Sequence, residues 1–111
     1  MAVTVKNIIA RKQAENAQTT QYTATNVKTI IDKFTVTNTT ATAATIAVNL
    51  VASGGAAGAS NTVLYTKSVA AGETYTCPEL VGQVLEDGGF ISTIAGTASA
   101  LTISASGREI S

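Results

Sequence analysis

The sequence predicts an all-β protein, an antiparallel β-sandwich with Greek-key or jelly-roll-like connections and about six to eight strands. Three observations support this fold class. Threonine is frequent along the whole chain, and β-branched residues suit a pleated surface. Apolar and polar residues alternate with a period of two in several short runs. Turn sequences separate these runs by about 8 to 12 residues, and a helical pattern is almost absent.

The first segment of the chain differs from the rest. Val3 and Val5 alternate with Thr4 as in a short strand, and a polar stretch follows. We therefore expect residues 1–21 to form an extended N-terminal arm and residues 22–111 to form the sandwich domain.

Several runs within the domain have the alternation of strands. In Thr29–Thr37, we expect Ile30, Phe34 and Val36 to share one face and Ile31 and Lys33 to share the other. The clearest strand covers residues 44–50. Further strands are expected at residues 62–69, 74–77, 90–95 and 98–105. We expect residues 53–61 to form a flexible loop and residues 78–85 to form either a single helical turn or a loop.

The composition limits both the core and the partners. The 111 residues fit one domain, with no Trp, two Phe and three Tyr, so the core is expected to be thin and built from Ile, Val and Leu. Seven basic and seven acidic residues give a formal net charge of zero. A nucleic-acid-binding protein normally has a basic excess, so we expect no such partner. We find no signal peptide and no membrane-spanning segment, and expect the chain to stay soluble in the cytoplasm where it is made.

Residues that carry chemistry are scarce. The chain has no His and one cysteine, Cys77, so neither an intrachain disulfide nor a typical zinc site is expected. Cys77 lacks a neighbouring base and is interpreted as a small buried apolar residue. Asp32 is expected to pair with Lys28 or Arg108, and Glu86 is expected to lie in a solvated turn. We expect no catalytic residue, no metal, no cofactor and no small-molecule substrate.

The distribution of charge is the strongest functional signal in the sequence. No charged residue occurs between Lys33 and Lys67, although exposed sandwich faces and edges usually carry Lys and Glu. We expect the uncharged stretch and the arm to be covered by identical subunits or by a partner protein. The candidate interface residues are Val3, Val5, Ile8, Ile9, Arg11, Thr35, Thr37, Thr45, Ala47 and Asn49.

Three phrases of the sequence resemble a known group of proteins. "IIDKFTVTNTTATAATIAVNLV", "VAAGETYTCPELVGQVLEDGGFIS" and "LTISASGREI" are similar, in order and wording, to small β-sandwich virion proteins of tailed bacteriophages. The resemblance covers roughly residues 20–110. It implies a capsid decoration (cement) protein on the outer surface of the virion, synthesised in the bacterial host cytoplasm. It also implies a homo-oligomer, a dimer or a trimer, that contacts the major capsid protein or other virion proteins.

Two alternatives stay open at this point. A neck, collar or tail accessory protein would fit the same resemblance. A carbohydrate- or receptor-binding sandwich is the other alternative, but such modules expose aromatic rings, and here five aromatic residues must also fill the core. Tyr22, Tyr65 and Tyr75 clustered on one exposed face would support that alternative.

Overall fold

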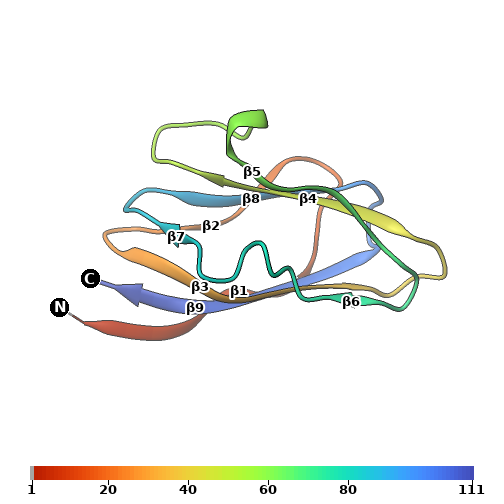
Figure 1. Cartoon of the computed structure of the whole chain (residues 1–111), viewed down its shortest axis with the longest axis horizontal. Helices are drawn as coiled ribbons and strands as arrows, with labels where there is room; N and C mark the ends of the chain where they lie inside the picture. Colours follow the sequence, from red (N-terminus) through yellow and green to blue (C-terminus); the bar gives the residue numbers. More distant parts are fainter. Residues whose placement is uncertain (1) are drawn as a thin grey trace.

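The chain folds into two antiparallel sheets that pack face to face as a β-sandwich (Figure 1). The structure is a computed structural model that describes residues 2–111, and it contains a short 3-10 helix, η1 (Ala59–Asn61), and nine strands. The strands are β1 (Val3–Gln13), β2 (Thr19–Thr23), β3 (Lys28–Asn38), β4 (Ala44–Val51), β5 (Thr62–Val69), β6 (Thr74–Tyr75), β7 (Val84–Leu85), β8 (Phe90–Ala95) and β9 (Leu101–Ile110). Within the described residues, no helix is long and apolar enough to cross a membrane.

The strand order is that of a jelly roll. One sheet runs β1-β9-β3-β6, with β7 also paired to β3, and the other runs β2-β8-β4-β5. β6 and β7 pair with opposite ends of β3, so they act as the two halves of one interrupted edge strand. With that strand counted once, eight strands alternate between the sheets, and only β4 and β5 form a hairpin. The predicted fold class is confirmed, with nine strands instead of six to eight.

The expected N-terminal arm is part of the sandwich body, and the boundary at residue 21 was wrong. Residues 3–13 form the edge strand β1, which pairs with β9 along its length (Figure 1). Ile8 and Ile9 are only 5% and 2% exposed, because register shifts on either side of Ile9 turn both side chains inward. Residues 19–23 form the edge strand β2 of the other sheet. The described part of the expected arm therefore contributes Ile8, Ile9 and Ala14 to the core.

The core between the sheets is thin and aliphatic, as expected. Its largest fully buried side chains include Phe34, Ile46, Ile91 and Ile103 from the central strands of both sheets. Leu80 adds to it from the turn before β7, whereas Val81 is 49% exposed. The segment 78–85 is therefore a series of turns ending in β7, the loop alternative of the prediction.

One face prediction for β3 was wrong, for the same reason as in β1. Ile31, not Ile30, lies with Phe34 in the core, and Ile30 points to the outer face. The register of β3 against β9 shifts between Ile31 and Lys33, so Asp32 is an extra residue. A bulge of this kind reverses the alternation of every residue before it.

Two buried asparagines fix the connections of the four-stranded sheet. Asn38 makes four side-chain hydrogen bonds at the turn between β3 and β4. The Asn49 side-chain amide donates to the Gly58 carbonyl, Asn61 Oδ1 and Thr62 Oγ1 at 2.8–3.0 Å. Two of these bonds fasten the 53–61 loop, predicted to be flexible, to β4, and the third reaches the first residue of β5.

Candidate functional site

The outer face of the five-stranded sheet is the most distinctive surface of the molecule. β9 runs through it with β1 on one side and β3 on the other (Figure 1). The small residues of β9 alternate, so that Ile103 and Ala105 point into the core while Thr102, Ser104 and Ser106 point outward. This face has two chemically different halves, and an ion pair lies where they meet.

The first half is apolar and lies near both chain ends. Cross-strand neighbours point to the same face of a sheet, and Val3 pairs with Ile110 while Ile30 pairs with Val84. Val5 is on the same face of β1 as Val3. We call this set the terminal patch: Val3, Val5, Ile30, Val84 and Ile110. Val5 is 78% exposed, Val3 56% and Val84 45%, and they are three of the five large apolar side chains that are exposed within residues 2–111.

An ion pair reaches into the terminal patch, because Arg108 of β9 lies between Val5 of β1 and Ile30 of β3 and pairs with Asp32 on the bulge of β3. Arg108 Nε donates to both carboxylate oxygens of Asp32 at 3.0 and 3.2 Å, and Nη2 donates to Oδ1 at 2.9 Å. These hydrogen bonds raise the pKa of Arg108. Of the two partners expected for Asp32, the structure selects Arg108, and Lys28 instead pairs with Glu86 at 3.4 Å. Both groups are exposed, so the pair adds little to stability.

The second half of the face is a polar groove of about 380 Å³, which we call the hydroxyl groove. Three strands supply its lining: Asn7 and Arg11 from β1, Thr102, Ser104, Ala105 and Ser106 from β9, and Lys33, Thr35 and Thr37 from β3. The lining contains five hydroxyl groups, one amide and two cations, and no carboxylate.

The ten candidate interface residues do not form one surface. Val3 and Val5 belong to the terminal patch, and Arg11, Thr35 and Thr37 line the hydroxyl groove. Ile8 and Ile9 are core residues and cannot contact a partner in the folded chain.

The remaining three candidates lie on the opposite side of the molecule. Thr45, Ala47 and Asn49 face outward from β4, in the four-stranded sheet. Ala47 and Asn49 are only 7% and 5% exposed, because the 53–61 loop folds over them. β3 and β4 are neighbours in the sequence but lie in different sheets, which the alternation pattern does not reveal.

Several residues of the face were not among the candidates. Lys33 was predicted on one face of the 29–37 strand and as one end of the uncharged stretch, Ser104 was placed in the predicted strand 98–105, and Ser106 lay beyond the end of that strand. The alternation of Thr, Ser and Ser with apolar residues in "LTISAS" is the signal that could have found them, because it places small hydroxyls on one face. Ile30 and Val84 could not be found in this way, since a bulge and a two-residue strand place them.

The tyrosines do not gather on one face. Tyr22 and Tyr75 pack against the core, whereas Tyr65 is 78% exposed beside a hollow of about 280 Å³ under the 53–61 loop. The Tyr22 hydroxyl donates to Glu109; burial first, and this hydrogen bond second, raise the pKa of Tyr22 to about 12. The arrangement that would favour a carbohydrate-binding module is not present.

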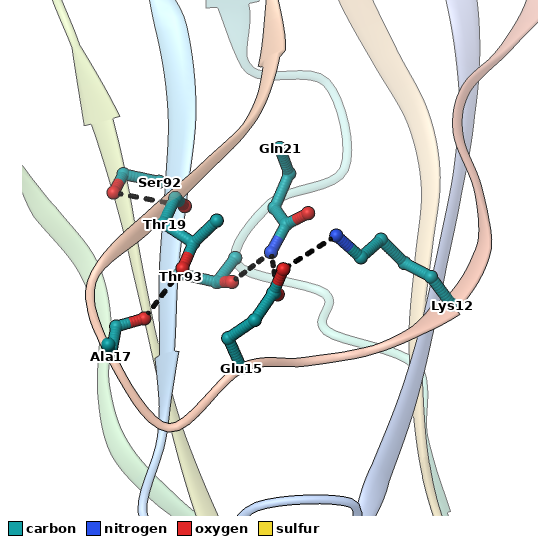
Figure 2. Close-up of polar contacts among 7 residues, drawn as sticks. All are labelled: Lys12, Glu15, Ala17, Thr19, Gln21, Ser92 and Thr93. Carbon is teal, nitrogen blue, oxygen red and sulfur yellow. Dashed lines mark hydrogen bonds and ion pairs between the residues drawn. The ribbon is translucent and has the colours of Figure 1, made fainter.

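A polar cluster closes one side of the sandwich between β1 and β2 (Figure 2). Gln21 Nε2 donates to Glu15 Oε1 at 2.9 Å and to Thr93 Oγ1 at 3.0 Å, while Lys12 Nζ donates to Glu15 Oε2 at 2.9 Å. The bond from Gln21, followed by that from Lys12, lowers the pKa of Glu15. Both carboxylate oxygens of Glu15 have partners, so we interpret the cluster as a structural element that closes this side of the sandwich.

The remaining reactive groups are isolated from one another. Cys77 is buried, and desolvation raises the pKa of its thiol to about 12, which agrees with its interpretation as a small apolar residue. Residues 2–111 hold no group of three or more His, Cys, Asp or Glu side chains placed to share a metal ion.

Comparison with known proteins found no matching family model, no similar curated protein and no similar solved structure. The fold itself defines the protein as a jelly-roll β-sandwich. The outer face of its five-stranded sheet has two parts, the apolar terminal patch and the cationic hydroxyl groove.

Proposed function

We propose that this chain is a structural subunit of a tailed-bacteriophage particle, most simply a capsid decoration protein on the outer surface of the virion. It would act by burying the outer face of its five-stranded sheet against neighbouring subunits. The observation that carries the proposal is the terminal patch. The resemblance of the sequence to small virion sandwiches supplies the biological context.

The terminal patch has the properties of a contact surface. Three exposed valines from two separate strands lie on one face of the sheet with Ile30 and Ile110, on either side of Arg108. Apolar groups gathered in this way on a sheet face usually mark an interaction site, because isolated exposed apolar residues would be scattered. A standard interface buries roughly 800 Å² on each partner, so the patch would form the centre of a larger contact.

The uncharged stretch contributes less to the proposal than the sequence indicated. β3 and β4 are inner strands of their sheets, and six of the eight residues of β4 are buried. Burial within one chain is enough to explain most of the missing charge. The proposed interface is therefore the terminal patch and the neighbouring edge of β1.

The proposed partners are the major capsid protein and further copies of the same chain. A dimer or trimer would present several terminal patches at once, and closed rings are the usual form of such assemblies. The unpaired outer edge of β1 lies beside the patch and could take part in the same contact.

A neck, collar or tail accessory protein is the second candidate, because the same face could form contacts within a ring. Copy number in purified particles distinguishes the two: a capsid protein follows shell symmetry with on the order of hundreds of copies, and a ring protein has about a dozen. Quantitative mass spectrometry against the major capsid protein gives this number. Absence from particles would refute both.

The contact surface itself is tested by Val5→Asp, with Tyr65→Asp as the matched control. Both side chains are 78% exposed, but they lie on opposite sheets. We expect both variants to fold with the thermal stability of the original chain. Only Val5→Asp should fail to attach to particles that lack the protein, because it places a charge in the patch. Full attachment of Val5→Asp would contradict the proposed contact.

A further inference from the structure

The charges of the molecule are almost completely paired, with one local exception. Four of the seven basic side chains form ion pairs: Lys6 with Glu109, Lys12 with Glu15, Lys28 with Glu86 and Arg108 with Asp32. A fifth, Lys67, lies 4.8 Å from the ring centroid of Tyr75. In the part of the chain that the structure describes, the remaining two, Arg11 and Lys33, have neither kind of partner. Both line the hydroxyl groove.

The carboxylates are distributed differently. Four form the ion pairs above, and the other three accept hydrogen bonds from neutral groups: Glu73 from the Ala70 backbone, Glu79 from the Tyr75 hydroxyl and Asp87 from the Asn26 backbone. None of the seven lines the hydroxyl groove, so Arg11 and Lys33 form a local positive site on a protein with zero formal net charge.

The neutral groups of the hydroxyl groove are also without partners. Thr37 shares a hydrogen bond with Thr74 at 3.0 Å. Within residues 2–111, the other polar side chains of the lining make no side-chain hydrogen bond: Asn7, Arg11, Lys33, Thr35, Thr102, Ser104 and Ser106. Their donors face the groove and are free for a ligand with acceptor oxygens.

The hydroxyl groove has two rims, formed by β1 and β3, and a floor formed by β9. Arg11 comes from β1 and Lys33 from β3, and β9 lies between these strands. Two strand spacings separate the rims by roughly 10 Å. The bulges that flank Ile9 alter the alternation of β1, and a bulge in β3 precedes Lys33. Bulges at sheet edges commonly redirect side chains toward a binding site.

We infer that the hydroxyl groove binds an extended acidic segment of another protein, with carboxylates held by Arg11 and Lys33 and polar groups held by the serines and threonines of the floor. This inference goes beyond the proposed function, because it concerns a separate site and rests only on the groove. Arg can hold a carboxylate through two parallel hydrogen bonds, and Lys adds a second point charge across the floor.

Size, aromatic content and charge favour this occupant over others. At about 380 Å³, the groove has room for roughly twelve water molecules, which is large for one inorganic anion. No aromatic ring lines it, so a sugar or a nucleobase would have no stacking surface. A second copy of this chain is disfavoured, since four of its seven carboxylates are already held in ion pairs.

The test uses the full chain, labelled with ¹⁵N, and NMR titration with an acetylated ten-residue peptide of alternating Glu and Thr. The matched peptide of alternating Gln and Thr carries no charge. Inorganic phosphate and a ten-nucleotide oligothymidylate report the alternative anions. We expect shifts at Asn7, Ser104 and Ser106 with the acidic peptide only, weakening as salt is raised.

Variants locate the binding to the groove. Arg11→Gln and Lys33→Gln should each weaken peptide binding by roughly 2- to 5-fold, the size of an exposed charge contact, and the double variant by roughly 4- to 25-fold. Lys67→Gln removes the same charge from the other sheet and should leave the affinity unchanged. Arg11 and Lys33 are exposed, so their variants should keep the original melting temperature, and Lys67→Gln, at a half-buried position, should lose at most about 1 kcal/mol with its contact to Tyr75.

Each outcome decides the inference. Binding of the Gln peptide with equal affinity, tighter binding of phosphate or the oligonucleotide, or an equal loss in Lys67→Gln would overturn it. So would affinity within 2-fold of the original in the double variant. The two proposals can fail separately, because Val5→Asp leaves the hydroxyl groove intact. If the acidic peptide binds but Val5→Asp still attaches to particles normally, only the proposed terminal-patch contact is refuted.

Discussion

Asn38 offers the sharpest test of how the fold is held together. Its side chain is 1% exposed at the point where β3 crosses to the other sheet. Nδ2 donates to the carbonyls of Thr42 and Val69 at 2.8 and 2.9 Å, and Oδ1 accepts from the backbone and hydroxyl of Thr40 at 2.9 and 2.7 Å. One amide thus connects the end of β3 to its turn and to the end of β5.

The cost of Asn38→Ala follows from these four bonds. A typical hydrogen bond contributes a net ~1 kcal/mol, and a buried group left without its partner costs about 1 to 3 kcal/mol. The two bonds from Thr40 can be replaced by water, because this residue is half-exposed. The bond to the Val69 carbonyl is buried and cannot. We expect a loss of about 2 to 4 kcal/mol in the free energy of unfolding, a large part of the 5 to 15 kcal/mol typical of a domain.

Urea denaturation followed by circular dichroism measures this loss. With a slope of about 1 to 3 kcal/mol/M, the midpoint should fall by roughly 1 to 3 M. Asn38→Asp should cost at least as much, since a carboxylate cannot donate to either carbonyl. Asn7→Ala, at an exposed asparagine, is the control and should stay within about 0.5 kcal/mol. An Asn38→Ala midpoint equal to that of the control would refute the reasoning.

Three further predictions concern packing and titration. Gly107→Ala should destabilise by about 1 to 3 kcal/mol in the same assay, because its methyl carbon would lie closer than 3.0 Å to the Ile30 carbonyl oxygen. Gly58→Ala meets no atom within 4 Å and should be neutral, so equal effects would contradict the packing argument. Since the pKa of Tyr22 is raised to about 12, its contribution to stability should be complete below about pH 10 and lost as the pH rises toward 12. A Tyr22→Phe variant that lacks this loss of stability at alkaline pH would support its attribution to Tyr22. A variant with the same dependence of stability on pH as the original chain would contradict it. Cys77 should not react with a thiol reagent at about pH 8 until the chain is unfolded; rapid reaction of the native protein would show that the thiol is accessible.

The strands with regular alternation could be predicted from the sequence. Ala44, Ile46 and Val48 lie in the core as the pattern of β4 indicates, and so do Leu101 and Ile103 of β9. In these segments the alternation is kept, because the register shifts of β4 and β9 place the extra residues on their partners β5, β1 and β3 and not on β4 or β9 themselves.

The errors have two physical causes. Bulges at Ile9 and Asp32 shift the alternation, and they depend on pairing with β9, whose residues lie far away in the sequence. The hydroxyl groove and the terminal patch likewise draw on three or four strands that only the topology brings together. Local patterns therefore predicted strands well, and predicted surfaces poorly.

The position of β9 has a consequence for how the molecule forms. β9 is the last strand of the described chain, yet it lies between β1 and β3 and pairs with both. During synthesis, β1 and β3 would therefore leave the ribosome without their shared neighbour, with Ile9 and Phe34 still uncovered. The five-stranded sheet can close only after β9 has emerged, and folds dominated by such distant pairings are slow to form. Until then the nascent chain exposes unpaired strand edges, and its yield in a cell would depend on protection from aggregation during that interval.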